Sequence, residues 1–156
     1  METTNNFLLT QVAEIELIYK SKVKASDRPK VTTSHDAFKL FKQNWDENKI
    51  ELVEQFKVLF LNRANKALAI YELSTGGMTG TVADPKIVFA AALKLTACNI
   101  ILCHNHPSGN LKPSRADEEL TQKMKEAGKY LDLPVIDHII IIAEDGYYSF
   151  ADEGLL

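Results

Sequence analysis

Three residues between positions 104 and 117 have the types and spacing of a divalent metal site. His104 and His106 stand two apart at the end of an apolar run predicted to be a strand, so both side chains project to the same side. A turn containing Pro107 and Gly109 then returns the chain, and Asp117 falls in the first turn of the next predicted helix. Two imidazoles and one carboxylate leave a fourth zinc position open to water, which is typical of a catalytic zinc site.

Parts of this pattern also have a purely structural interpretation. Ser114 and Asp117 match the Ser-x-x-Asp capping box, which by itself explains both residues as a helix start. The His-x-His pair together with the carboxylate and the Gly/Pro turn favours the metal site. Ser114 then has a second role open to it, a hydrogen bond to the oxyanion of a tetrahedral intermediate. Cys103 is an alternative ligand; otherwise Cys103 and Cys98 are small buried residues, too far apart along one strand for a disulfide.

Hydrolysis at such a site needs a general base that is not itself a metal ligand. The carboxylates offered by the sequence are Glu47, Glu51, Glu54 and Glu72. Glu54 stands at the start of an apolar predicted strand, so a sheet would hold its position. Any one of these four carboxylates can instead be a solvated surface charge.

The Asp137-His138 pair allows a structural or a functional interpretation. His138 follows Asp137 in a predicted strand, where it could hold a ligand imidazole in orientation. The alternative is a structural pair that satisfies the edge of the sheet. His35 and Trp45 are predicted to be structural.

The elements that must position these residues follow from periodicity and capping signals. The order predicts an α/β fold of three layers, a mixed sheet flanked by helices. Open α/β sheets place ligands at the carboxyl ends of strands, where His104 and His106 fall. A glycine-rich loop over 76–80 lacks the Gly-Lys-Ser/Thr of a phosphate-binding loop. The predicted strands cover 13–19, 54–61, 67–73, 99–103, 135–142 and 147–150, with a frayed end over 1–10. The predicted helices cover 34–46, 84–97 and 114–131, and each begins at its predicted N-cap, namely Ser34, Asp84 and Ser114.

Composition excludes several classes of protein. The 156 residues suit one domain, with 46% hydrophobic and 25% charged residues. A net charge of -3 provides no global basic field for nucleic acid or anionic lipid. We see no apolar run of the roughly 18 residues that span a membrane, and no secretory signal. We therefore expect a cytoplasmic protein with reduced thiols and no membrane association.

The motif residues resemble a known family. His104-Asn105-His106-Pro107-Ser108-Gly109 resembles the signature hexapeptide of the RadC family. The wider order His104, His106, Ser114, Asp117 is similar to the JAMM (MPN+) metalloprotease motif. Glu54-Gln55-Phe56 fits the Glu-x-Phe segment that opens the first core strand of RadC-like chains, and this match selects Glu54 as the base. The resemblance also takes in Asp84-Pro85, Pro113-Ser114 and Asp137-His138.

This resemblance implies a fold, a cofactor and a reaction. The fold would be JAMM-like, similar to that of cytidine deaminases, over residues 51–156. Residues 1–50 would form a strand–helix extension packed on that domain. The implied cofactor is Zn²⁺, and the implied reaction is hydrolysis of peptide or isopeptide bonds in a peptide or protein substrate, with Glu54 and Ser114 as catalytic residues. The natural substrate and homo-oligomerisation stay open.

Two other functions compete with hydrolysis. The first is that of a non-catalytic binding module in DNA repair or mobile-element DNA processing, acting with DNA or repair partners. A basic strip could contact DNA, or could be a solvated face. This strip consists of Lys20, Lys22, Lys24, Arg28 and Lys30. Longer RadC-like members begin with a helix-hairpin-helix region, whereas the first 50 residues here predict one strand and one helix.

The second competing function is nucleobase deamination, suggested by similarity of fold. Zinc deaminases need His-x-Glu and Pro-Cys-x-x-Cys, which this chain lacks.

Overall fold

The computed structural model describes residues 13, 15–78 and 80–156. A mixed sheet of five strands, in the order β2-β1-β3-β4-β5, forms its centre. Strands β3 and β4 are parallel and the other neighbouring pairs are antiparallel. The strands are β1 (Gln55–Leu61), β2 (Ala67–Thr75), β3 (Asn99–Asn105), β4 (Val135–Ile141) and β5 (Tyr147–Ser149); the helices are α1 (Ser34–Gln43), α2 (Pro85–Lys94) and α3 (Arg115–Tyr130).

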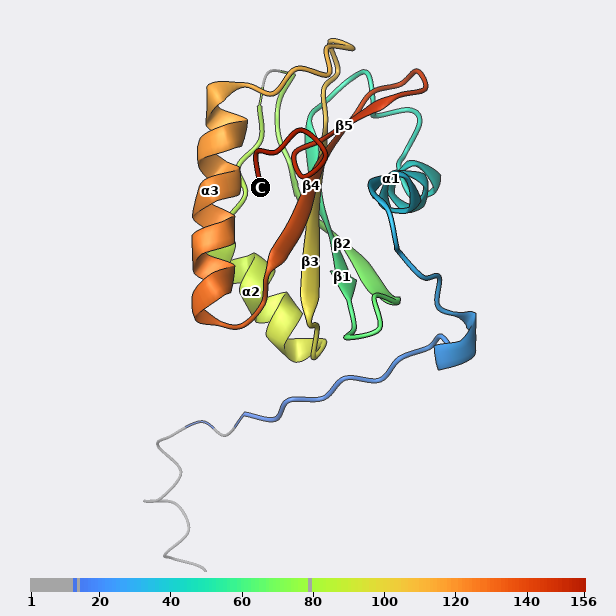
Figure 1. Ribbon diagram of the computed structural model, residues 1–156, viewed down its shortest axis with the longest axis vertical. Coiled ribbons are helices and arrows are strands. Elements are labelled where there is room, and N and C mark those ends of the chain that lie inside the picture. The colour runs from blue at the N-terminus through green and yellow to red at the C-terminus, as the bar shows by residue number, and fades with distance from the viewer. Residues whose placement is uncertain (1–12, 14, 79) are drawn as a thin grey trace, which may run out of the picture.

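Helices cover both faces of this sheet, with α2 and α3 on one side and α1 on the other (Figure 1). Alternate residues of β1 enter the two cores. Phe56, Val58 and Phe60 pack in the cluster that includes residues of α2 and α3, whereas Leu59 and Leu61 pack in the cluster that includes residues of α1. Because both faces are covered, every residue of β1 is buried, which explains its dense apolar run. The predicted three-layer α/β fold is confirmed.

The predicted strand over 13–19 is wrong for the residues that the structure describes. Ala13 and residues 15–19 form no strand, and Ile15 and Leu17 are 87% and 80% exposed. Their alternating pattern favours an extended backbone, but a strand is stable only when another strand pairs with it. The segment instead extends away from the body (Figure 1). The predicted frayed end over 1–10 lies outside the described residues.

The helix boundaries differ from the sequence prediction in three places. Thr33, not Ser34, is the N-cap of α1. The Thr33 side chain accepts from the backbone N–H of Asp36, and the Asp36 side chain accepts from the backbone N–H of Thr33. Helix α1 ends at Gln43 rather than at 46. Helix α2 ends at Lys94 rather than at 97, and Thr96 has a left-handed backbone (φ 53°) that no α-helix continues through.

The remaining elements agree with prediction to within two residues at each end. Asp84 caps α2, with Pro85 as its first residue, and Ser114 caps α3. In the part of the chain that the structure describes, no helix combines the length and the apolar character that crossing a membrane requires.

Candidate metal centre

His104 lies inside the sheet. Strand β3 continues through Asn105, two residues further than predicted, so His104 pairs with Phe56 on β1 and with Ile140 on β4. The His104 side chain is 1% exposed. Its ring stacks on that of Phe56, with 6.0 Å between centroids and 3° between planes. Neighbours on both sides therefore hold this imidazole in one orientation.

The other two candidate ligands come from the loop after β3 and from the start of α3. The backbone N–H of His106 donates to the carbonyl oxygen of Ile141 (3.0 Å), and its ring Nδ1 lies 2.6 Å from the carbonyl oxygen of Asn110. Oδ2 of Asp117 accepts from the backbone N–H of Ser114 at 2.7 Å. The capping box of α3 thus holds the Asp117 carboxylate beside the end of β3.

The structure brings the three predicted ligands together. Nε2 of His104 lies 2.9 Å from Nε2 of His106 and 3.3 Å from Oδ1 of Asp117. Nε2 of His106 lies 3.4 Å from Oδ2 of Asp117. One ligand atom from each residue falls within 4.8 Å of the others. Two imidazole nitrogens and a carboxylate are thus positioned to share one ion.

The chemistry of these donors fits a cation. A carbonyl oxygen can only accept, so Nδ1 of His106 donates to Asn110, and a neutral His106 carries its lone pair on Nε2. That lone pair faces Nε2 of His104 and the Asp117 carboxylate. Positive charge, as shared protons or as a metal ion, is what reconciles these electron-rich atoms. Imidazole nitrogen and carboxylate oxygen are ligands that zinc takes.

The electrostatics of the protein without metal agree with this interpretation. Burial acts to raise the pKa of Asp117, but hydrogen bonds from His104 and His106 hold that pKa far below its usual range. Burial acts to lower the pKa of His106, but the hydrogen bonds to Asp117 and to the Asn110 carbonyl raise it. The carboxylate therefore stays ionised and draws positive charge toward the point that the three residues share.

Glu54 and Ser114 line the same cavity as His106 and Asp117, with a volume of about 410 Å³. Burial raises the pKa of the Glu54 carboxyl, and the nearby His104 opposes this rise. The hydroxyl oxygen of Ser114 accepts from the N–H of Asp117 at 3.1 Å, while its proton has no acceptor among the described residues. Capping therefore leaves this hydroxyl free to donate into the cavity.

The other carboxylates considered from the sequence lie elsewhere. Glu72 is 3.6 Å from the ammonium of Lys57 and accepts from Nε2 of Gln55. Glu47 and Glu51 line a different cavity, which Lys42 of α1 and Trp45 also line. Of the four carboxylates, the structure brings only Glu54 to the cavity of the candidate metal centre.

The Asp137–His138 pair divides between two roles. His138 is fully buried, and its Nε2 lies 2.8 Å from Nδ1 of His104. The Asp137 carboxylate instead accepts from the Ser149 hydroxyl and from the backbone N–H groups of His138 and Ala151. Asp137 thus joins β4 to the C-terminal segment and does not reach the candidate ligands.

Two residues that contact this site were missed from the sequence. Asn105 lies between the two histidines, and its side chain bonds the backbone on both sides of Glu54. Thr121 contacts His138, with 2.6 Å between its hydroxyl and Nδ1. Thr121 stands one helical turn after Asp117, so its spacing from that residue is the signal that could have identified it.

Comparison with known proteins identifies the family of this chain. The family model described as RadC-like JAB domain matches residues 31–155. The chain belongs to this family. This chain is 48% identical over 126 residues to a UPF0758 protein of Flavobacterium johnsoniae, covering 81% of this chain and 53% of the relative. It is 41% identical over 127 residues to a UPF0758 protein of Caldanaerobacter subterraneus, covering 77% of this chain and 53% of that relative. The RadC-like JAB domain thus spans about half the length of these relatives.

Cys103 does not serve the metal centre of this RadC-like JAB domain. Its thiol packs in the core on the α1 side of the sheet, whereas Phe56, which stacks on His104, packs in the core on the other side. Successive side chains of a strand point to opposite faces, so Cys103 and His104 cannot reach one ion. Cys98 and Cys103 are both free thiols.

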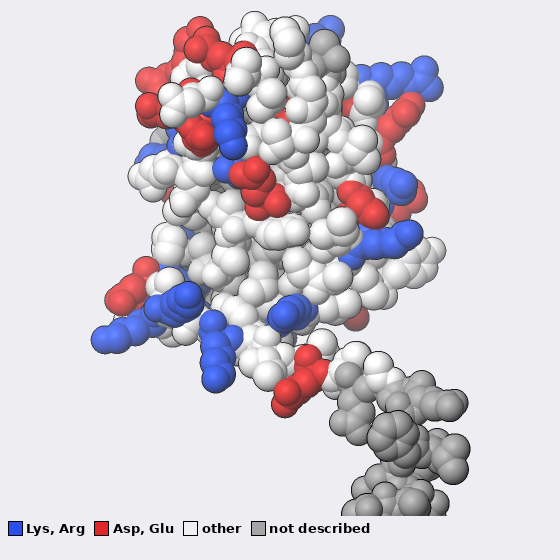
Figure 2. Space-filling model, turned by 180° about the vertical axis from the view of Figure 1, so that it is seen from behind, with Lys and Arg blue, Asp and Glu red and all other residues white. Residues whose placement is uncertain are grey.

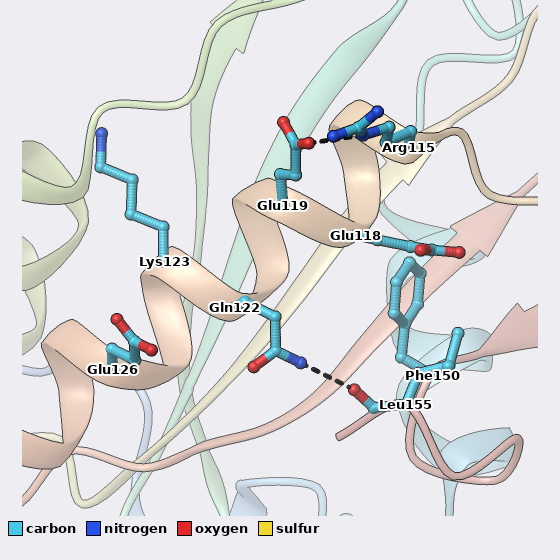
Figure 3. A pocket seen from close by; sticks show the side chains of 8 residues that line it. All are labelled: Arg115, Glu118, Glu119, Gln122, Lys123, Glu126, Phe150 and Leu155. Carbon is cyan, nitrogen blue, oxygen red and sulfur yellow. Dashed lines mark hydrogen bonds and ion pairs between the residues drawn. The ribbon is translucent and has the colours of Figure 1, made fainter.

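A groove of about 500 Å³ lies between α3 and the C-terminal segment of the RadC-like JAB domain (Figure 3). Opposite charges meet there, as in the 2.8 Å pair of Arg115 and Glu119, and Gln122 donates to the carbonyl oxygen of Leu155. No predicted site residue lines this groove. Its remaining lining residues are Glu118, Lys123, Glu126 and Phe150.

The predicted basic strip of the RadC-like JAB domain lies on the N-terminal segment. Residues 20–24 of this segment are exposed, and Lys30 forms an isolated bridge with Lys66 beside β2. Seen from behind, basic side chains are most frequent on the lower part of the body, near this segment, but acidic side chains lie among them (Figure 2). DNA binding stays a prediction.

Proposed function

We propose that this chain is a zinc-dependent hydrolase that cleaves peptide or isopeptide bonds. The observation that carries the proposal is the convergence of two imidazole nitrogens and one carboxylate on the wall of a cavity that Glu54 and Ser114 also line. Membership of the RadC-like JAB domain family supports the same chemistry.

Each residue has a distinct part in the proposed reaction. His104, His106 and Asp117 hold the ion. Zinc bound there would supply Lewis acidity and lower the pKa of a coordinated water toward 7. Glu54 takes the proton of the attacking water and delivers it to the amine that leaves. The free proton of Ser114 donates to the oxyanion that develops from the substrate carbonyl.

The surroundings of Glu54 suit this part. Its carboxyl is half-buried, so its pKa is raised by loss of solvation. A general base works best when its pKa approaches the working pH, and this shift is in that direction. Its backbone is bonded to the glycine-rich loop, because Gly76 donates to the Glu54 carbonyl and the Glu54 N–H donates to Gly77. The base is therefore held by both the sheet and the loop.

A polypeptide substrate is favoured by the rim of the cavity. Met78 lines it and is 75% exposed, and the nearby Val82 is 82% exposed. Exposed apolar side chains beside a polar site are suited to contact with a peptide. The natural substrate is therefore proposed to be an extended peptide or an isopeptide-linked tail.

Elemental analysis combined with a peptide digest tests the proposal. We expect about one zinc per chain in the purified protein and new peptide termini when a proteome-derived peptide library is incubated with it. Glu54→Gln should keep the zinc and lose about 100- to 10,000-fold of the cleavage rate, because it removes the base and leaves the ligands intact. Mass spectrometry of the digest measures the cleavage rates of the wild type and of Glu54→Gln.

Glu51→Gln is the matched control, since Glu51 is an exposed carboxylate outside the cavity. It should cleave like the wild type. A protein without zinc, a zinc-loaded protein that cleaves nothing in the library, or a Glu54→Gln variant as active as the wild type would each overturn the proposal.

A further inference from the structure

A buried set of hydrogen bonds extends from the candidate metal centre into the core between β4 and α3. Nδ1 of His104 lies 2.8 Å from Nε2 of His138, and Nδ1 of His138 lies 2.6 Å from the hydroxyl of Thr121. The Thr121 hydroxyl donates to the carbonyl oxygen of Asp117 at 2.6 Å. None of these three side chains is more than 1% exposed. We call His104, His138 and Thr121 the imidazole network.

The directions of these hydrogen bonds follow from the last acceptor. The Asp117 carbonyl can only accept, so it takes the single proton of the Thr121 hydroxyl. The Thr121 oxygen must then accept from His138, which places a proton on Nδ1 of His138. A neutral His138 has its lone pair on Nε2, so Nδ1 of His104 must be the donor to it.

The consequence reaches the metal centre. With its proton on Nδ1, a neutral His104 has its lone pair on Nε2, the atom that faces His106 and Asp117. If His138 carried its proton on Nε2, His104 would have to accept at Nδ1. The proton of His104 would then sit on Nε2 and block the ion. The direction of one hydrogen bond in the core thus decides whether His104 can be a ligand.

Packing holds the network in this arrangement. The ring of His138 stacks on that of Phe150, with 4.7 Å between centroids and 15° between planes, and Phe56 contacts it from another side. Because both rings are enclosed, neither His138 nor His104 can rotate to exchange its two nitrogens without opening the core. The hydroxyl of Thr121 is therefore the group that selects the tautomer.

We propose that Thr121 and His138 are positioning residues that set the tautomer of His104 for metal binding. Thr121 also bonds the backbone of Asp117, so the network joins His104 to a second residue that would hold the ion. Hydrogen bonds of this kind to a ligand imidazole are worth about 10- to 100-fold in metal affinity. The inference rests on the proposed zinc site, and it assigns the preorganisation of that site to residues outside it.

Zinc affinity of paired Thr121 variants tests the proposal. Thr121→Val keeps the shape of the side chain and removes the hydroxyl, whereas Thr121→Ser keeps the hydroxyl. We expect Thr121→Val to bind zinc about 10- to 100-fold more weakly than the wild type in competition with a chromophoric chelator. The zinc affinity of Thr121→Ser should stay within about 3-fold of that of the wild type in the same competition. Equal affinity of the wild type and a folded Thr121→Val variant would overturn the role of Thr121.

A measurement on the wild type keeps the proposal testable if Thr121→Val does not fold. Side-chain ¹⁵N NMR of the histidines reports which nitrogen of His138 carries the proton. We expect Nδ1–H, with and without zinc, and Nε2–H would overturn the network. Failure of the proposed function can be told apart from failure of this inference. If the wild type binds no zinc, the proposed function is wrong, while the NMR result still decides the tautomer of His138.

Discussion

Asn105 makes three hydrogen bonds although it faces away from the two histidines that flank it. Its Nδ2 donates to the carbonyl oxygens of Ile50 (2.7 Å) and Val53 (2.9 Å), and its Oδ1 accepts from the N–H of Gln55 (2.7 Å). These partners lie on both sides of Glu54 in the sequence. One buried amide thus fixes the distance between β3, which carries the candidate ligand His104, and the segment that carries the proposed base.

We predict that Asn105→Asp separates metal binding from turnover. The new carboxylate would face two carbonyl oxygens, and an unsatisfied or repelled buried polar group costs about 1–3 kcal/mol or more. The free energy of unfolding in urea should fall by that amount, and cleavage should fall with zinc still bound. Unchanged cleavage by the folded variant would contradict the positioning of Glu54 by Asn105.

The decline of activity at acid pH should report the protonation of Glu54. Burial raises the pKa of this carboxyl above its ordinary value of 4.5, and a general base works only when it is ionised. Activity of the zinc-loaded protein should therefore decline on the acid side, as the pH falls through the pKa of Glu54. Plots of kcat/KM against pH for a cleaved library peptide would measure it. A kcat/KM that shows no acid-side decline while zinc stays bound would contradict the assignment.

At the scale of elements, α1 depends on a capping box whose strength varies with pH. Three groups donate to the Asp36 carboxylate, namely the Thr32 N–H, the Thr32 hydroxyl and the Thr33 N–H. The hydrogen bonds from Thr32 are the main reason that the pKa of Asp36 falls from 3.8 to about 2. Because the pKa is lower in the folded state, this stabilisation is complete above about pH 4 and is lost as the pH falls toward 2.

Asp36→Ala should therefore lower the free energy of unfolding by about 1 kcal/mol at pH 7, the usual worth of a helix cap. The difference from the wild type should shrink as the pH falls from 4 toward 2, since the wild-type carboxylate becomes protonated there. Urea unfolding at several pH values measures it. A difference that stays constant down to pH 2 would show that the charge of Asp36 has no part in the cap.

At the scale of the whole molecule, the N-terminal segment and the core contribute unequally to stability. Ile15 and Leu17 are almost entirely exposed, so they remove little apolar surface from water. Phe41 of α1 is fully buried against the sheet. Stability therefore resides in the three layers, and the exposed residues 15–24 before η1 (Ala25–Asp27) contribute little to it.

The double substitution Ile15→Ser and Leu17→Ser should change the free energy of unfolding by less than about 0.5 kcal/mol. Phe41→Ala, the matched control from the core, should cost about 3–5 kcal/mol. Urea unfolding of both variants provides the comparison. A large loss from the double substitution would mean that the segment packs against something in solution, contrary to its exposure in the structure.

The sequence by itself determined the features that depend on near neighbours. The His-x-His pair, the turn after it and the capping box at Ser114 and Asp117 lie within a short stretch, so local geometry carries them to one place. Helix caps and apolar periodicity likewise predicted most elements and the three-layer fold, because these signals act within one or two turns or along one strand.

Only the tertiary structure decided which distant residues meet this stretch. The pairing of Phe56 with His104 brings Glu54 to the cavity and leaves Glu72 beside Lys57, a choice that no local signal contains. His138 meets His104 because β4 pairs with β3, and Thr121 meets His138 because α3 packs against β4. The strand predicted over 13–19 is absent from the described residues of that range for the same reason, since pairing depends on a partner that the pattern alone does not specify.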